Sequence, residues 1–229
     1  QMETLLHLSQ TMLQMHDYAG AAGLLKEVLQ NEPENMQAMR LFAAALIQLR
    51  RPDDAIPIID NMMKLRQAES ESHLLMALAA LSMDRVGMAA EQYAELRKKM
   101  TDPRELPQSF MAHVIKLMVD QWRPSSLKTK GHRPISLNTI NRFAEALVSI
   151  DLKQDAEPFR AISDTLTKRA LLLSRQGAYS EAVLVLRAGI DDRRENSTAE
   201  VIDWLRRAMQ AEPDETSYRH VLALLYVSV

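Results

Sequence analysis

The chain of 229 residues contains no cysteine, only 6 glycines and few aromatic residues, which make up 5% of it. Without cysteine there is no disulfide, no zinc site of the cysteine type and no thiol nucleophile. Scarce glycine argues against nucleotide-binding α/β folds, because their phosphate loops depend on glycine. Few β-branched and aromatic residues, against 32 Leu, 28 Ala and 14 Met, predict an all-α protein.

The sequence also lacks a strong charge of one sign and a long apolar run. The formal net charge of −2 gives no basic field for nucleic acid or an acidic membrane. No apolar run approaches the ~18 residues of a membrane span. Residues 1–5 lack the basic and apolar regions of a secretory signal, and the leading Gln1 suggests that the native start lies elsewhere. We expect a cytoplasmic protein, with the periplasm or another compartment as the alternative if a signal was removed.

A 34-residue repeat organises the first hundred residues. Ala21, Ala55 and Ala89 are 34 residues apart, and neighbouring columns keep the same step and size class. These columns are Leu8, Phe42 and Met76; Ser9, Ala43 and Ala77; Met12, Leu46 and Ala80; Leu25, Ile59 and Tyr93; and Val28, Met62 and Leu96. Apolar positions recur at three and four residues, so each unit predicts two amphipathic helices. The small residues allow the two helices of a unit to approach closely.

This pattern resembles the tetratricopeptide repeat family, whose 34-residue unit is a helix-turn-helix with the same order of large and small residues. The first copy matches at Tyr18, Ala21 and Pro33, and residues 177–182 are similar to the family's inter-helix turn. The second and third copies carry Gln67 and Thr101 where the family usually has proline. The resemblance implies an all-α, right-handed superhelical solenoid of about five to six antiparallel helix pairs, some of them degenerate.

The chain is predicted to have three parts. Residues 1–102 form three regular repeats, residues 103–135 form an extra helix and a basic loop with proline and glycine, and residues 136–229 form degenerate repeats. The extra helix is expected from Pro107 to Trp122. In the last part the spacing fails, because Ala156 and Ala182 are only 26 residues apart. Shortened helices, merged helices or missing segments would each explain this spacing.

No motif for catalysis, cofactor binding or metal binding stands out. No two of the six histidines are three or four residues apart, and no nucleophile elbow, Walker loop or dinucleotide fingerprint occurs. Asp53 and Asp54 resemble paired carboxylates, but capping and the helix dipole explain them better at a predicted helix start. We therefore expect neither enzymatic activity nor a cofactor or metal.

The concave surface of the predicted solenoid is the informative one. By the resemblance, first helices line it with the positions Leu6, Gln10, Leu13, Arg40, Leu41, Ala44, Ile47, Gln48, Leu74, Leu75, Leu78 and Leu81. Relatives that bind acidic chain ends of chaperones carry Lys, Arg and Asn on this face. The matching positions here are Leu6, Gln10, Leu41, Glu71 and Leu75, so an acidic chain end is not the expected ligand. The apolar groove predicts a protein or peptide with apolar anchors, unless later helices of the chain cover these leucines.

Two functions fit these features. The first is a non-catalytic scaffold that binds an apolar or amphipathic partner segment in the groove, as a chaperone or adaptor in a secretion or assembly system. Its groove is similar in character to that of repeat-containing type III secretion chaperones. The second is a structural subunit that docks, or self-associates, through convex surfaces or an apolar end with Leu222, Leu225 and Tyr226. The basic loop 123–134 lacks interleaved aromatic residues, which favours a solvated connector over a nucleic-acid contact.

Overall fold

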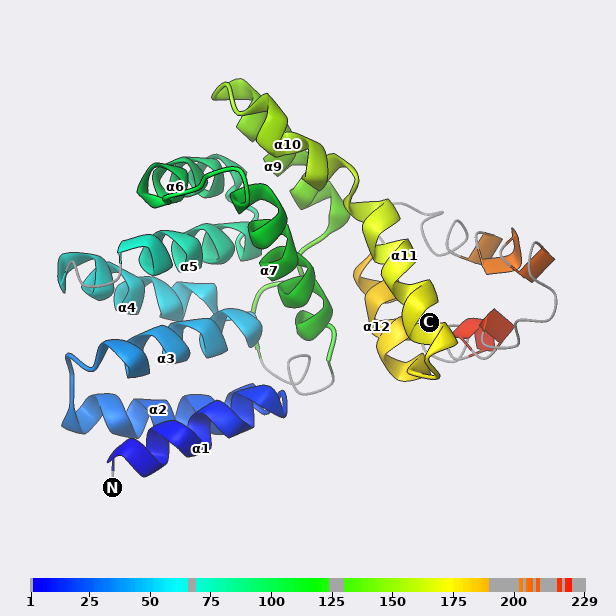
Figure 1. The fold of residues 1–229 in the computed structure, drawn as a ribbon. Helices are drawn as coiled ribbons and strands as arrows, with labels where there is room; N and C mark the ends of the chain where they lie inside the picture. The colour runs from blue at the N-terminus through cyan, green and yellow to red at the C-terminus, as the bar shows by residue number, and fades with distance from the viewer. Residues whose placement is uncertain are drawn as a thin grey trace.

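The computed structural model describes residues 2–65, 69–123, 130–189 and, towards the end, 202–203, 205–207, 209–210, 218–219 and 221–223. Within these residues the chain is helical and has no strand. Consecutive helices pair as antiparallel hairpins, and the hairpins stack in chain order (Figure 1). The pairs are α1 (Met2–Gln14) with α2 (Tyr18–Asn31), α3 (Met36–Gln48) with α4 (Pro52–Leu65), α5 (Glu69–Ser82) with α6 (Val86–Lys99), α9 (Leu137–Ser149) with α10 (Lys153–Arg160), and α11 (Ile162–Arg175) with α12 (Tyr179–Ala188). The expected all-α solenoid of helical hairpins is confirmed.

The turn inside each hairpin is built in the same way. A residue with positive φ follows the first helix, and the amide of the next residue donates to the carbonyl five residues before it. This backbone pattern satisfies carbonyls at the end of a helix and reverses the chain. The residues with positive φ are His16, Arg50, Asp84, Asp151 and Gly177. The first three are 34 residues apart, so the sequence repeat is also a backbone repeat.

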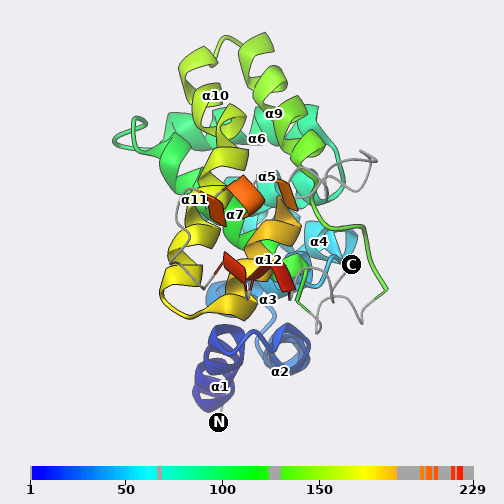
Figure 2. The ribbon, with the colours of Figure 1, turned by 90° about the vertical axis from the view of Figure 1, so that its right-hand side faces the viewer.

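Helix α7 (Leu106–Gln121) stands outside this pairing. In Figure 1 it runs back across the stack, from the α6 end towards α3. α9 then packs on α6, so the α9–α10 hairpin continues the stack that α1 to α6 begin. α11 and α12 lie in front of α7 in the view of Figure 2, and α12 contacts α7. The helix expected from Pro107 to Trp122 is therefore an insertion laid across the stack.

The 26-residue spacing between Ala156 and Ala182 comes from a shortened helix. α10 has 8 residues, where α2, α4 and α6 each have 14. Only Ala161 separates α10 from α11, whereas residues 32–35 separate α2 from α3. Pro158 lies inside α10, where its ring removes a helical hydrogen bond. A short helix and a short connection thus account for the lost residues.

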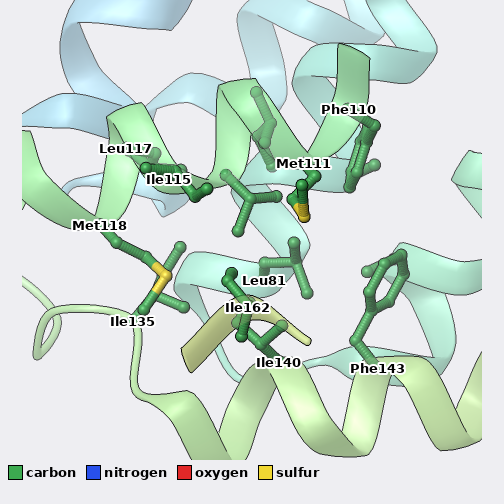
Figure 3. Close-up of a cluster of buried hydrophobic side chains, with 14 of the residues drawn as sticks. Leu81, Phe110, Met111, Ile115, Leu117, Met118, Ile135, Ile140, Phe143 and Ile162 are labelled. Carbon is green, nitrogen blue, oxygen red and sulfur yellow. The ribbon is translucent and has the colours of Figure 1, made fainter. Parts of the chain in front are cut away.

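The core is continuous through the three predicted parts of the chain. One cluster of buried side chains extends from Met39 in α3 to Val221. Four of the few aromatic residues meet in it, with ring centroids 5.1–6.2 Å apart: Tyr93, Phe110, Phe143 and Phe159. Figure 3 shows Phe110 and its neighbours on α7 facing Phe143 and Ile140 on α9. The insertion helix is thereby part of the core of the stack.

Candidate functional site

A pocket of about 510 Å³ opens between α1, α3 and α5 on one side and α7 on the other. Its volume lies in the usual range for binding pockets, about 300–1,000 Å³. Nine of the twelve predicted groove residues line it: Leu13, Arg40, Leu41, Ala44, Ile47, Gln48, Leu74, Leu75 and Leu78. Pocket and predicted groove therefore coincide over the first helices of the first three hairpins.

The three other predicted groove residues lie elsewhere. Leu6, 9% exposed, packs against Ala21 and Leu25 in the first hairpin. Gln10 is half-buried and does not line the pocket. Leu81 requires a correction, because it is 1% exposed and lies between side chains of α7 and α9 (Figure 3). The repeat columns carry no information on where α7 lies, so they place Leu81 on an open surface that α7 in fact covers.

Helix α7 supplies the wall that the repeat pattern does not predict. His113, Lys116 and Leu117 face the pocket from this helix. The sequence contains one indication of this wall. Phe110 and Leu117 belong to an apolar helical face, and that face directly follows three predicted hairpins whose groove leucines no other predicted helix covers. An amphipathic helix in that place must bury its apolar face, and the uncovered first helices are the nearest surface.

The floor of the pocket is mainly apolar. Leu13, Leu41, Ala44 and Leu74 are half-buried, so part of their surface is open to the pocket, whereas Leu75 and Leu78 are each 7% exposed. A few polar groups lie among them. Arg40 on α3 and Glu71 on α5 form an ion pair with an Nη1–Oε1 distance of 3.1 Å, and both side chains are partly exposed. An exposed pair of this kind contributes about 0–1 kcal/mol, so it marks the rim more than it stabilises the fold.

A buried carboxylate lies beside the pocket-lining Lys116, near the α1–α2 turn. Asp120 of α7 is 2% exposed, and it accepts hydrogen bonds from Lys116 Nζ at 2.5 Å and from Arg123 Nε at 2.9 Å. His16 Nδ1 lies 3.4 Å from its Oδ1 and 2.9 Å from the hydroxyl oxygen of Tyr18. The carboxylate therefore ties the C-terminal end of α7 to the turn of the first hairpin.

The same network continues into α12. Both terminal nitrogens of Arg123 donate to the carboxylate of Glu181 at 2.9 Å, and the Arg187 guanidinium lies 4.9 Å from the centre of the Trp122 ring. Bidentate pairs between arginine and carboxylate are among the stronger polar contacts in proteins. The C-terminal end of α7 is thus held from both sides, by the first hairpin and by α12.

Electrostatics around Asp120 favour its ionised form. Burial raises the pKa of this carboxyl, but hydrogen bonds from Lys116, Tyr18 and Arg123 outweigh burial and leave the pKa below its ordinary value. Burial and the neighbouring Asp120 raise the pKa of Tyr18 well above its ordinary value. Burial and the charge of Arg123 lower the pKa of His16. Each of these groups has a partner in the network. We therefore interpret the shifted pKa values as a result of structural contacts that hold α7 in place.

The carboxylates and the basic loop considered above meet each other in the structure. Asp53 and Asp54 lie in the first turn of α4, and their partners are His132 at 2.7 Å and Arg51 at 2.6 Å. The amide of His132 also donates to a backbone oxygen of the α3–α4 turn at 2.7 Å. The described end of the basic loop, from residue 130, therefore packs on this turn, and residues 124–129 lie outside the described residues.

The predicted docking end is covered only in part by the structure. Val221 is fully buried, and Leu222 is half-buried against the chain's own core, whereas Leu225 and Tyr226 lie outside the described residues. Across the described ranges, no group of three or more His, Asp or Glu side chains is arranged to hold a metal ion. Of the helices described, none has the length and apolar character needed to cross a membrane.

Comparison with known proteins agrees with the hairpin stack. Residues 12–81, from the end of α1 to the end of α5, match the family model described as tetratricopeptide repeat. No curated protein matches the chain. The matched segment contains the second hairpin and most of the pocket floor, and repeats of this family generally mediate interactions between proteins. On the match, the 34-residue turns and the stacked hairpins, residues 12–81 consist of tetratricopeptide repeats and the chain folds as a solenoid of this type.

Proposed function

We propose that this protein is a non-catalytic scaffold that binds an apolar or amphipathic segment of a partner protein in the pocket between α1, α3, α5 and α7. The observation that carries this proposal is the half-buried state of Leu41 and Leu74 on the pocket floor. The chain covers the adjoining Leu81 with its own helix and leaves these two leucines open. Apolar surface that remains open beside a closed core is typical of a binding site.

The size of the pocket sets the scale of the affinity. Fully burying one side chain the size of Leu or Phe contributes about 1.5–3 kcal/mol. The pocket admits a few such side chains, and the loss of freedom on association offsets part of their contribution. We therefore expect a complex in about the micromolar range. Such a scaffold would act as a chaperone or adaptor that shields an apolar segment of its partner during assembly or secretion.

The experiment selects peptides from a display library on the immobilised protein. It then measures their affinity for the unchanged protein and for the variants Leu74→Asp and Leu172→Asp. Leu74→Asp places a charge on the open floor and should weaken binding by about tenfold or more, because the charge would be buried without a partner. Leu172→Asp is the matched control, since Leu172 is 57% exposed on α11 and does not line the pocket. Circular dichroism checks that both variants keep the helical signal. Equal affinity of the selected peptides for all three proteins would contradict the proposal.

A further inference from the structure

We infer that a second partner protein docks in a separate cleft, formed by α6 and the turn between α9 and α10, with a short segment that carries an aliphatic side chain beside a Lys or Arg side chain. The cleft has a volume of about 610 Å³. It shares no lining residue with the pocket between α1, α3, α5 and α7, so the inference does not depend on the proposed function.

The apolar part of the cleft is centred on the α9–α10 turn. Ile150 and Leu152 flank Asp151, the residue of this turn with positive φ. Leu152 is half-buried against the core of the stack, whereas Ile150 is 41% exposed, one of four large apolar side chains exposed among the residues that the structure describes. Ala94 of α6, with its short side chain, lines the same cleft. An aliphatic side chain from a partner would therefore bury the open surface of Ile150 between α6 and the turn.

The charges of the cleft leave one acid unmatched. Both cations that line it already have partners within the chain. Arg97 Nε donates to the carboxylate of Asp155 at 3.0 Å, and in the same way Lys98 Nζ donates to Glu95 at 2.6 Å. Glu91, one turn before Glu95 on α6, is exposed and forms no ion pair with any residue that the structure describes. A Lys or Arg side chain of the partner would match this charge, whereas an acidic segment would be repelled.

The size of the cleft requires the two features of the partner to be close together in its sequence. The lining residues of α6 extend from Glu91 to Lys98, which is two turns of the helix or about 10 Å. An extended chain covers this length in about three residues, and a helix brings positions three or four apart to one face. The aliphatic anchor and the cation should therefore lie within about four positions of each other. With the pocket and this cleft, the scaffold would hold two partners at once.

The test uses a display library of short peptides, selected on the full chain and counter-selected on Ile150→Asp. We expect the retained peptides to bind this variant about tenfold or more weakly than the unchanged protein, because a charge would be buried against the aliphatic anchor. Leu172→Asp is the matched control and should cause no loss, since Leu172 is 57% exposed and lies outside the cleft. Ala94→Arg, which fills the cleft and repels a cation, is the second blocking variant should Ile150→Asp fail to fold.

A charge exchange tests the part played by Glu91. Glu91→Lys should weaken the retained peptides by about threefold or more, because it replaces an attraction by a repulsion. Changing the basic residue of the peptide to Glu should then restore the affinity for this variant, a rescue that a mere change in stability would not produce. Glu27→Lys is the control for the charge, since Glu27 is exposed on α2 and outside the cleft.

The outcomes separate this inference from the proposed function. A selection that retains no peptide would overturn the inference, and so would retained peptides without a basic residue near an aliphatic one or with equal affinity for Glu91→Lys and the unchanged protein. The retained peptides should bind Leu74→Asp as they bind the unchanged protein, because Leu74 lines the pocket and not the cleft. A loss with Leu74→Asp would place them in the pocket, which would overturn the inference and leave the proposed function in place.

Discussion

Replacing Phe110 tests whether α7 is held in the stack as described. This side chain is fully buried, and its ring lies 5.1 Å from Tyr93, 5.8 Å from Phe143 and 6.0 Å from Phe159. Phe110→Ala removes it from a site that draws residues from four helices, so a cavity remains. Large-to-small changes of this kind cost about 3–5 kcal/mol, a large share of the about 5–15 kcal/mol that stabilises a typical native protein.

Thermal unfolding followed by circular dichroism measures this loss. For a chain of this size, 1 kcal/mol corresponds to about 2–4 °C in Tm, so Phe110→Ala should lower Tm by about 6–20 °C. Phe110→Leu is the matched control and should cost less than about 1.5 kcal/mol, because it keeps most of the buried volume. A loss below about 1 kcal/mol for Phe110→Ala would refute the packing of α7 against α6, α9 and α10.

Three further results are expected. The free energy of unfolding should decline as the pH falls below 6.5, because the pKa of His16 is lowered in the folded protein and the unfolded chain binds the proton first. It should decline again below 3.8, because the pKa of Asp120 is also lowered and its stabilising contribution is complete only above its unfolded pKa. Denaturant melts of His16→Asn should show a weaker first decline. Gly131→Ala should cost about 1–3 kcal/mol, since its Cβ would lie 2.2 Å from a backbone oxygen, whereas Gly23→Ala, with open space around it, should be stabilising by calorimetry. Leu81→Asp should lose the cooperative thermal transition, because a charge at a site 1% exposed has no partner.

The repeat columns predicted the stack because its packing is local. Ala21, Ala55 and Ala89 are all fully buried, as are Ser9 and Ala43 in the facing column. A small residue every 34 positions is what two closely packed helices need, whatever the rest of the chain does. The hairpins therefore follow from sequence spacing, and much of the pocket floor follows from that spacing together with the resemblance to the family.

The place of α7 and the network at its end could not be predicted in this way. An amphipathic face shows that a helix packs against something, but an inserted helix has no counterpart in the repeats that would fix its position. Asp120 meets His16, and Arg123 meets Glu181, although the partners are distant in the chain and belong to no shared motif. Long-range polar contacts of this kind depend on the finished geometry, and so does the burial of Leu81 beneath α7.

The most direct test of the account is to locate the bound peptide on the protein. Leucine methyl groups are labelled, and their NMR signals are followed as a selected peptide is added. We expect the largest shifts at Leu41, Leu74 and Leu117, which surround the pocket, and little change at the exposed Leu8 and Leu172. Shifts confined to Leu8 or Leu172, with the pocket leucines unchanged, would contradict the assignment of this pocket as the binding site.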